Sequence, residues 1–254
     1  MTTNTENSSF PQSTTTQRDE ILWALVPVKQ LDQSKRRLKH CLGDSRHEFS
    51  VAMLKDLLNA LLRCSTIPHT AIVTADQRVK SIGKHYGALV VNESESGNMN
   101  LAVSQGVKAI QDAGGTHVAV FPADIPLVTG DEIDRLIQAM RVGYGNGAGR
   151  SIGICPSADQ GGTNFLYLDT AGDFSFGYGP GSYQLHLKAA SEASCQVITF
   201  SSPTVSLDID RQKDLDRYIS YCMLNSGFKE TESWRFLWAG GYIERAGNRQ
   251  GMQP

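Results

Sequence analysis

The feature of this sequence that most constrains its fold is an alternation of short apolar runs with longer amphipathic stretches. The runs occupy residues 21–28, 69–74, 88–91 and 117–121, and the first (ILWALVPV) is apolar throughout. Such a run is typical of a strand buried on both faces of a parallel sheet. The stretches between the runs carry apolar residues at helical spacing, most clearly over 46–63. Strands that alternate with helices in this way predict βαβ units with right-handed crossovers.

The second half of the chain continues the alternation with one exception. Strands expected at 151–155 and 164–168 are joined by a Gly161-Gly162 turn instead of a helix. Further helices are expected at 79–85, 100–112, 131–140 and 183–193, a strand at 195–200, and a last helix after residues 207–210. The sequence therefore predicts an α/β fold with one domain, in which helices flank a mostly parallel, twisted, Rossmann-like sheet.

Composition divides the 254 residues into three parts. Residues 1–19 are mostly Thr, Ser, Asn and Gln, which is typical of a disordered polar tail. The folded domain is expected over 20–224. Residues 225–254 form an extension that holds two of the three Trp residues, and its last nine residues (AGNRQGMQP) are expected to be disordered.

Charge and hydropathy exclude several classes of function. The chain has 24 Lys and Arg against 26 Asp and Glu, whereas a general nucleic-acid binder has a positive excess. No apolar stretch approaches the roughly 18 residues that a membrane span needs, and no signal-peptide segment is recognised. The five cysteines are odd in number and never form a C-x-x-C pair, which predicts reduced thiols. We therefore expect a cytoplasmic protein without nucleic-acid or membrane partners.

A basic segment follows the first predicted strand, where many proteins of this fold class carry a glycine-rich loop. Neither G-x-G-x-x-G nor G-x-x-x-x-G-K-[ST] occurs, which disfavours a dehydrogenase and a P-loop protein. Residues 29–39 carry five basic residues against Asp32 alone, a local charge of +4. Cations at the carboxyl end of a strand would neutralise a triphosphate. The alternative is a solvated charged loop.

Carboxylates are expected at the same edge of the sheet. Asp124 directly follows the strand at 117–121, between two prolines, and Asp208 and Asp210 follow a later strand. One or two carboxylates, with water and substrate phosphates, suit Mg²⁺, so these residues are candidate metal ligands. The alternatives are that Asp124 bonds its own turn backbone and that Asp210 caps a helix. If the strand continues, Asp208 and Asp210 point to opposite sides and only one is a ligand.

Two glycine-containing loops follow, GGTN at 161–164 and YGPGS at 178–182. Ser182 is expected to cap the next helix. Free backbone N–H groups together with a helix N-terminus would bind a phosphate or carboxylate. The alternative for either loop alone is an ordinary turn.

Taken in order, these pieces resemble the 2-phospholactate guanylyltransferase family of coenzyme F-420 biosynthesis, whose fold is related to the molybdenum-cofactor nucleotidyl- and cytidylyltransferases. The resemblance extends from about Leu25 to Leu215. Each fragment alone is weak, but seven in this order are specific. They are Val26-Pro27-Val28-Lys29 with Lys35-Arg36-Arg37-Leu38, Thr74-Ala75-Asp76, Met99-Asn100-Leu101-Ala102, Pro122-Ala123-Asp124-Ile125-Pro126-Leu127, Gly161-Gly162-Thr163-Asn164, Gly179-Pro180-Gly181-Ser182 and Leu207-Asp208-Ile209-Asp210.

The resemblance implies an enzyme that condenses GTP with a phosphorylated three-carbon acid and releases pyrophosphate. Lys29, Lys35 and Arg37 would be the catalytic cations that bind the triphosphate. Asn100 lies where nucleotide contact is expected, although a helix N-cap is an equal alternative. Asp124 matches the metal-site aspartate of the family.

The acceptor-binding positions of the family match Thr163, Gly179 and Ser182 in this sequence. Two positions depart from the family pattern, because Arg36 replaces a small residue and Tyr178 replaces the common Phe. The product would pass to a deazaflavin-transferring enzyme. The acid is left open among 2-phospholactate, phosphoenolpyruvate and 3-phosphoglycerate, as is the oligomeric state, for which a homodimer is one option.

Two other functions compete with this one. Another nucleotidyltransferase of the same fold, of the molybdenum-cofactor or sugar-phosphate type, usually carries a glycine-rich loop after the first strand, which this chain lacks. A non-catalytic nucleotide-binding module would keep the basic segment but would need neither Asp124 nor the two acceptor loops.

Overall fold

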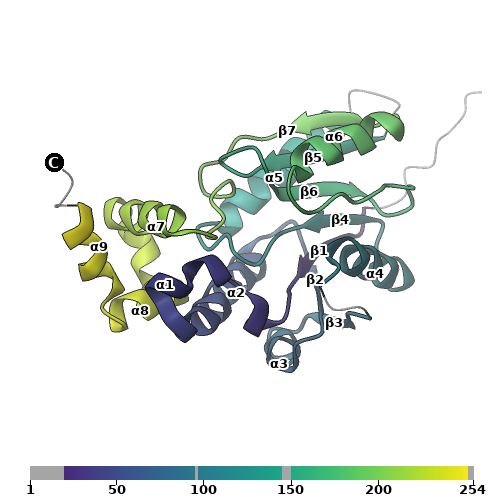
Figure 1. The fold of residues 1–254 in the computed structure, drawn as a ribbon. Helices are drawn as coiled ribbons and strands as arrows, with labels where there is room; N and C mark the ends of the chain where they lie inside the picture. The colour runs from purple at the N-terminus through teal and green to yellow at the C-terminus, as the bar shows by residue number, and fades with distance from the viewer. Residues whose placement is uncertain (1–19, 95–96, 145–149, 251–254) are drawn as a thin grey trace, which may run out of the picture.

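The computed structural model describes residues 20–94, 97–144 and 150–250, which form a seven-stranded sheet in the order β3-β2-β1-β4-β6-β5-β7 (Figure 1). The strand β6 runs antiparallel to its neighbours β4 and β5, and the other neighbouring pairs are parallel. The strands are β1 (Leu22–Pro27), β2 (His69–Thr74), β3 (Leu89–Asn92), β4 (His117–Val120), β5 (Ser151–Pro156), β6 (Thr163–Asp169) and β7 (Gln196–Thr199). The predicted α/β fold with a mostly parallel sheet is confirmed.

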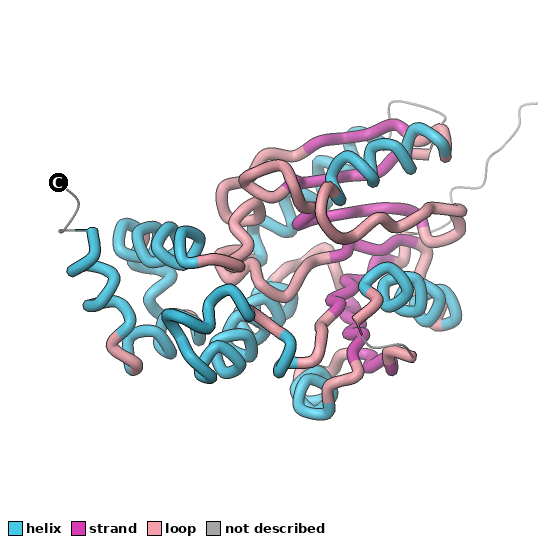
Figure 2. Tube along the Cα trace, in the orientation of Figure 1, coloured by secondary structure: helices cyan, strands magenta, loops and turns pink. Residues whose placement is uncertain are grey.

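Helices cover both faces of the sheet, as Figure 2 shows. Successive side chains of β1 point to opposite faces, so Ala24 and Val26 pack in one core and Leu25 in the other. The first core is closed by α2, α3 and α5, and the second by α4 and α6. These helices are α2 (Arg46–Arg63), α3 (Gln77–His85), α4 (Met99–Asp112), α5 (Gly130–Tyr144) and α6 (Ser182–Glu192). Burial of β1 on both faces explains its uninterrupted apolar sequence.

The basic segment after β1 folds into short helical turns. These are η1 (Leu31–Gln33), η2 (Arg36–Leu38), α1 (Lys39–Leu42) and η3 (Gly43–Ser45). Their apolar residues Leu38 and Leu42 are buried in a third core, together with Phe49 and Met53 of α2. The segment is therefore anchored to the body of the protein and is not a loop exposed along its whole length.

The C-terminal extension completes this third core. Its elements η4 (Ser226–Glu230), α8 (Glu232–Ala239) and α9 (Tyr242–Gln250) follow α7 (Gln212–Leu224), and these helices gather beside α2 (Figure 1). Trp234 is buried there, and the buried Asp56 of α2 accepts hydrogen bonds from the backbone N–H groups of Glu232 and Ser233 at 2.7 and 2.9 Å. The expected disorder from residue 246 is wrong as far as residue 250, because α9 continues to that residue. Residues 1–19 and 251–254, also expected to be disordered, lie outside the described residues.

The cap expected at Ser182 is not seen in the structure, and neither are the alternative cap roles of Asn100 and Asp210. The side chain that caps α4 is that of Asn98, which accepts from Leu101 N at 3.1 Å, while the Asn100 amide is bound elsewhere. Ser182 is the first residue of α6 and Gly181, with a φ of +77°, takes the cap position. Arg211 takes the cap position of α7, and Asp210 is directed toward Lys35. In each case a long-range contact replaces the local cap.

No helix among the described residues is long and apolar enough to cross a bilayer.

Candidate active site

Three aspartates from two distant segments meet beyond the carboxyl ends of β1 and β4. Asp124 follows β4, while Asp208 and Asp210 lie on the segment that leads into α7. The two segments are joined directly, because Ile209 N donates to Asp124 O at 3.0 Å. The predicted convergence of these carboxylates at one edge of the sheet is thus seen in the structure.

Lys35 lies between two of these carboxylates. Its ammonium group donates to Asp210 Oδ1 at 2.6 Å and to Asp124 Oδ2, and its side chain is only 7% exposed. The residue has a φ of +50° and a ψ of +36°, the left-handed conformation that a lysine rarely adopts. The ionic contacts and the buried neighbours of the segment hold Lys35 in this conformation. The expected alternative that Asp124 bonds its own turn backbone is not seen.

The charges of this cluster stabilise one another. Burial alone would lower the pKa of Lys35, but the charges of Asp124 and Asp210 outweigh it and raise that pKa above its ordinary value. The charge of Lys35 in turn lowers the pKa of Asp210. Lys35 is therefore a permanent cation that keeps Asp210 ionised.

Asp208 has a different environment from Asp210. Its Oδ1 accepts a hydrogen bond from Asn164 Nδ2 at 3.0 Å, and the same amide group donates to Val205 O. Burial and the nearby charge of Asp124 raise the pKa of Asp208 above its ordinary value. Asn164 thus fixes one carboxylate of the cluster, a role that the sequence analysis did not assign to it. The position of Asn164 in the GGTN motif is the sequence feature that could have indicated this role.

The cluster offers donor atoms that suit a divalent cation. The second oxygen of Asp124, Oδ1, is buried and has no hydrogen-bond partner among the described residues. In this structure Lys35 lies between Asp124 and Asp210. In the described part of the chain, no three Asp, Glu, His or Cys side chains are grouped so that together they could hold a metal ion. Mg²⁺ typically needs only one or two protein carboxylates, with water and substrate phosphates as its other ligands. Asp124, with Asp208 or Asp210, fits that requirement.

A pocket of about 640 Å³ opens beside this cluster at the amino end of α4. Lys29, Asn100, Tyr178 and Gly179 are among the residues that line it. The amide of Asn100 accepts from Tyr178 N at 2.6 Å and donates to Tyr178 O at 3.3 Å. Asn100 therefore fixes the backbone of the second glycine-containing loop along one wall of the pocket.

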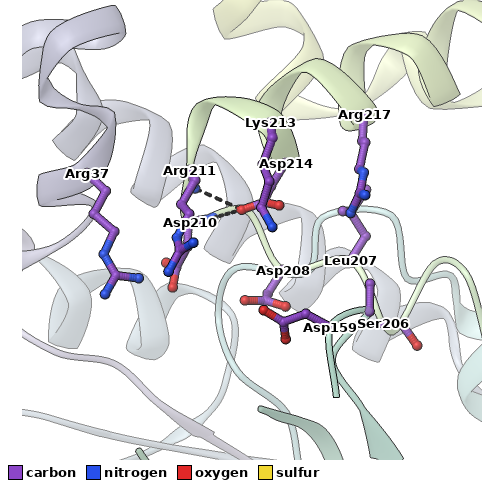
Figure 3. A pocket seen from close by; sticks show the side chains of 11 residues that line it. Arg37, Asp159, Ser206, Leu207, Asp208, Asp210, Arg211, Lys213, Asp214 and Arg217 are labelled. Atoms are coloured by element: carbon purple, nitrogen blue, oxygen red, sulfur yellow. Dashed lines mark hydrogen bonds between the residues drawn. The ribbon is translucent and has the colours of Figure 1, made fainter. Parts of the chain in front are cut away.

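A smaller pocket of about 70 Å³ lies on the other flank of Asp208 and Asp210, where α7 begins (Figure 3). Figure 3 shows Arg37 reaching toward it from the basic segment. Its other cations are Arg211, Lys213 and Arg217, none of which was predicted. Arg211 directly follows the LDID motif, and Lys213 and Arg217 lie further along the chain. The three predicted triphosphate-binding cations all lie near Asp210, because the charges of Lys35, Arg37 and Lys29 each lower its pKa. Lys29 and Arg37 line different pockets, and Lys35 is paired with carboxylates.

The two glycine-containing loops are bound to each other. Gly181 N donates to Gly161 O at 2.9 Å, and Ser182 N donates to Gly179 O at 3.1 Å. Gly161 N and Gly162 N donate to Asp159 Oδ1 and Ser157 Oγ. The prediction that free N–H groups of these loops form an anion site is therefore wrong for these four residues. The hydroxyl groups of Thr163 and Ser182 lie 3.3 Å apart, and both residues are buried.

The basic segment is held in register by residues outside the cluster. Asp76, at the end of β2, accepts from Leu31 N at 3.0 Å with one oxygen and caps α3 with the other. Ser34 Oγ lies 2.9 Å from Ser50 Oγ on α2. Leu31 and Ser34 directly precede Lys35, so these contacts fix the backbone that leads to it and explain why its side chain has a defined position.

The basic segment, the carboxylates and the paired loops all lie within the part of the chain that matches a known family. A family model described as "Guanylyl transferase CofC like" matches residues 22–234. The chain belongs to this family. It is 30% identical over 195 residues to a protein of Conexibacter woesei named phosphoenolpyruvate guanylyltransferase, a match that covers 76% of this chain and 85% of that protein. It is 28% identical over 193 residues to a 2-phospho-L-lactate guanylyltransferase of Methanocaldococcus vulcanius, covering 75% and 81%.

Solved structures show the same fold in other members of the nucleotidyltransferase class. A nucleotide-diphospho-sugar transferase from Desulfovibrio desulfuricans G20 superposes with a TM-score of 0.69 at 16% identity, covering 89% of this chain and 97% of that one. A cytidylyltransferase from Leptospira borgpetersenii superposes with a TM-score of 0.57 at 11% identity, covering 88% and 96%. This guanylyltransferase-family chain is a nucleotidyltransferase, as the sequence predicts.

Proposed function

We propose that this member of the CofC family transfers the guanylyl group of GTP to the phosphate of a small phosphorylated three-carbon acid. The observation that carries the proposal is the cluster of Asp124, Asp208 and Asp210 around Lys35, beside the pocket lined by Lys29 and Asn100. The names of the relatives support the guanylyl donor and the class of acid. Phosphoenolpyruvate, 2-phospholactate and 3-phosphoglycerate are the candidate acids.

The reaction needs positioning and charge neutralisation more than proton transfer. A phosphate oxygen of the acid attacks the α-phosphorus of GTP and forms a new P–O bond. The bond from the α-phosphorus to the oxygen that bridges to the β-phosphorus breaks, and pyrophosphate leaves with the electron pair. Because the acid's phosphate is already an anionic nucleophile near neutral pH, no general base is required. Stabilisation of the charge on the leaving group is the main task of the site.

The residues of the cluster divide this task. Mg²⁺, when bound through Asp124 with Asp208 or Asp210, would neutralise phosphate charge. Lys35 holds Asp124 and Asp210 in place and adds a fixed positive charge. Lys29 lines the larger pocket and Arg37 the smaller one, so each can bind a phosphate group there.

The two substrates would share the larger pocket. Asn100 would position GTP indirectly, since both ends of its amide are bound to the Tyr178 backbone. Thr163, Gly179 and Ser182 would bind the acid, with the Thr163 and Ser182 hydroxyl groups as donors to its anionic groups. In this proposal the enzyme acts in the cytoplasm in the biosynthesis of coenzyme F-420 or a derivative, and the activated acid passes to a deazaflavin-transferring enzyme. A homodimer is compatible with it.

The deciding experiment uses the purified full chain with Mg²⁺, each of the four ribonucleoside triphosphates and each of the three acids. Mass spectrometry is expected to detect a guanosine diphospho-acid and pyrophosphate from GTP with one of the acids. A parallel set of reactions replaces the acids with a sugar phosphate, and a product formed there, with none from the acids, would instead indicate another nucleotidyltransferase of this fold. Binding of nucleotide without any product would indicate a non-catalytic module.

A further inference from the structure

The hydroxyl pair of Thr163 and Ser182 lies next to a fully buried histidine. His186 is 0% exposed and lies one helical turn after Ser182 on α6, so the two side chains are on the same face of that helix. His186 Nδ1 is 2.9 Å from Thr163 Oγ1. Its other ring nitrogen, Nε2, accepts from Gly177 N at 3.0 Å.

The contact with Gly177 fixes the tautomer of this imidazole. A backbone N–H can only donate, so Nε2 must carry a lone pair. A neutral ring then carries its proton on Nδ1, and Nδ1–H donates to Thr163 Oγ1. Burial lowers the pKa of His186 to about 4, so the ring is neutral around pH 7. The rings of Phe174 and Tyr178 pack at centroid distances of 6.0 and 4.7 Å and exclude water from it.

The protons of this cluster can be counted. Thr163 Oγ1 accepts from the imidazole, and Ser182 Oγ donates to Thr163 Oγ1 at 3.3 Å. The proton of the Ser182 hydroxyl lies in the hydrogen bond between the two hydroxyl groups. The described residues offer no acceptor for the proton of the Thr163 hydroxyl. The cluster therefore has one O–H donor more than it can use internally. A donor without an acceptor suits an anion.

We propose that His186 is a positioning residue that orients the Thr163–Ser182 hydroxyl pair so that one O–H donates to an anionic group of the acceptor acid. This rests on the proposed function, in which the pair binds the acid. The pair is close to the larger pocket, because Ser182 N is bonded to Gly179 O and Gly179 lines that pocket. The Nδ1–H donor occupies an acceptor position of Thr163 Oγ1, so the Thr163 proton points away from His186. Without that donor the hydroxyl can rotate and no longer holds its proton toward the acid.

The kinetic test compares a set of variants with the wild type. In His186→Leu the KM for the acid is expected to rise about tenfold or more, while the KM for GTP and kcat change much less. In His186→Asn the amide can still donate to Thr163, so the KM should stay close to that of the wild type. A double variant with Thr163→Val and His186→Leu should have the same KM for the acid as Thr163→Val alone, because His186 acts through the Thr163 hydroxyl. Lys188→Ala, on the exposed side of α6, is the matched control.

An unchanged KM for the acid in His186→Leu would overturn the proposal. Additive effects of His186→Leu and Thr163→Val on that KM would also overturn it. Circular dichroism and thermal unfolding show whether each variant is folded. If His186→Leu does not fold, His186→Gln, which can accept from Gly177 N but lacks the donor to Thr163, provides the same comparison.

A second readout does not depend on activity. In ¹⁵N-labelled protein, long-range ¹H–¹⁵N spectra are expected to show a His186 ring with Nδ1 protonated and Nε2 unprotonated, without titration between pH 5.5 and 8. His186→Asn assigns the signals by their loss. Protonation on Nε2, or titration near pH 6.5, would refute the proposal even if the enzyme is active. If the tautomer is as expected and the wild type forms no product with any acid, the proposed function fails and the role of His186 toward the acceptor fails with it.

Discussion

The ammonium nitrogen of Lys35 lies 2.6 Å from a carboxylate oxygen of Asp210, a residue 175 positions later in the chain. The same ammonium group contacts Asp124, so a single cation joins the segment after β1, the segment after β4 and the segment before α7. Substitution of this lysine is therefore expected to change the stability of the protein as well as its activity.

Lys35→Met should lower the free energy of unfolding by about 2 kcal/mol, because Asp124 and Asp210 lose their partner while remaining partly exposed to water. A divalent cation can replace the lost charge, so millimolar Mg²⁺ should raise the Tm of this variant more than that of the wild type. Urea unfolding and thermal shift assays measure both effects. Lys39→Met, an exposed residue of the same basic segment, is the control. Equal stability of the two variants would contradict the assigned role of Lys35.

Asp124→Ala should reduce turnover with GTP, acid and Mg²⁺ by about 100-fold or more, because the proposed metal loses its central ligand. The fold should be retained, since the side chain of Asp124 is bonded only to Lys35 among the described residues. Pyrophosphate release measures turnover, and circular dichroism checks the fold. Near wild-type rates would reject the metal assignment. Asp112→Ala, an exposed carboxylate at the end of α4, is a suitable control.

Asn100→Ala should weaken substrate binding without unfolding the protein. The amide makes both of its contacts with the Tyr178 backbone, so its removal frees one wall of the 640 Å³ pocket. We expect KM to rise by about tenfold for at least one substrate. Steady-state kinetics against Ser104→Ala, an exposed residue one turn further along α4, isolate the effect. Unchanged KM values for both substrates would show that the contact is not needed.

Asp56→Ala should detach the C-terminal extension from α2. Asp56 accepts from two backbone N–H groups and from the Ser233 hydroxyl. The two backbone donors would be left without this partner, while the Ser233 hydroxyl would keep its contact with Tyr218. A loss of about 2–3 kcal/mol in the free energy of unfolding is expected. Limited proteolysis should cut within residues 225–250 faster than in the wild type. Cleavage at the wild-type rate would mean that the apolar contacts of Trp234 suffice to hold the extension.

Acidification should destabilise the wild type through His186. The unfolded chain takes up a proton on this residue near its ordinary pKa of 6.5, whereas the folded protein does so only near 4, so unfolding binds a proton between these values. The free energy of unfolding should therefore fall, relative to that of His186→Gln, by about 3 kcal/mol as the pH falls from 6.5 to 4. Urea titrations across this range provide the comparison, and contributions of other groups cancel in the difference. A difference that is independent of pH would contradict the buried neutral state.

Much of the fold could be predicted from local pattern. The helix over residues 46–63 and the strand over 69–74 have the predicted bounds, because each is specified by the periodicity of its own apolar residues. The meeting of Asp124 with Asp208 and Asp210 also followed from the sequence, since the carboxyl ends of parallel strands lie at one edge of a sheet even when the strands are not neighbours.

The parts that could not be predicted depend on contacts between distant residues. Asn98 and Asn100 are chemically equivalent cap candidates, and only the position of the Tyr178 backbone assigns Asn100 to the loop. No local pattern singles out His186 among the six histidines, because its partners Thr163 and Gly177 reach it only when α6 packs against β6 and the loop before α6.

The sequence by itself determined the class of fold, the family and the residue types of the site, because periodicity and motif order are local properties of the chain. The tertiary structure decided which partner each polar side chain has. Lys35 illustrates the difference: its charge is evident from the sequence, but its burial between Asp124 and Asp210 requires three segments to meet, and that depends on the packing of the whole sheet and its helices.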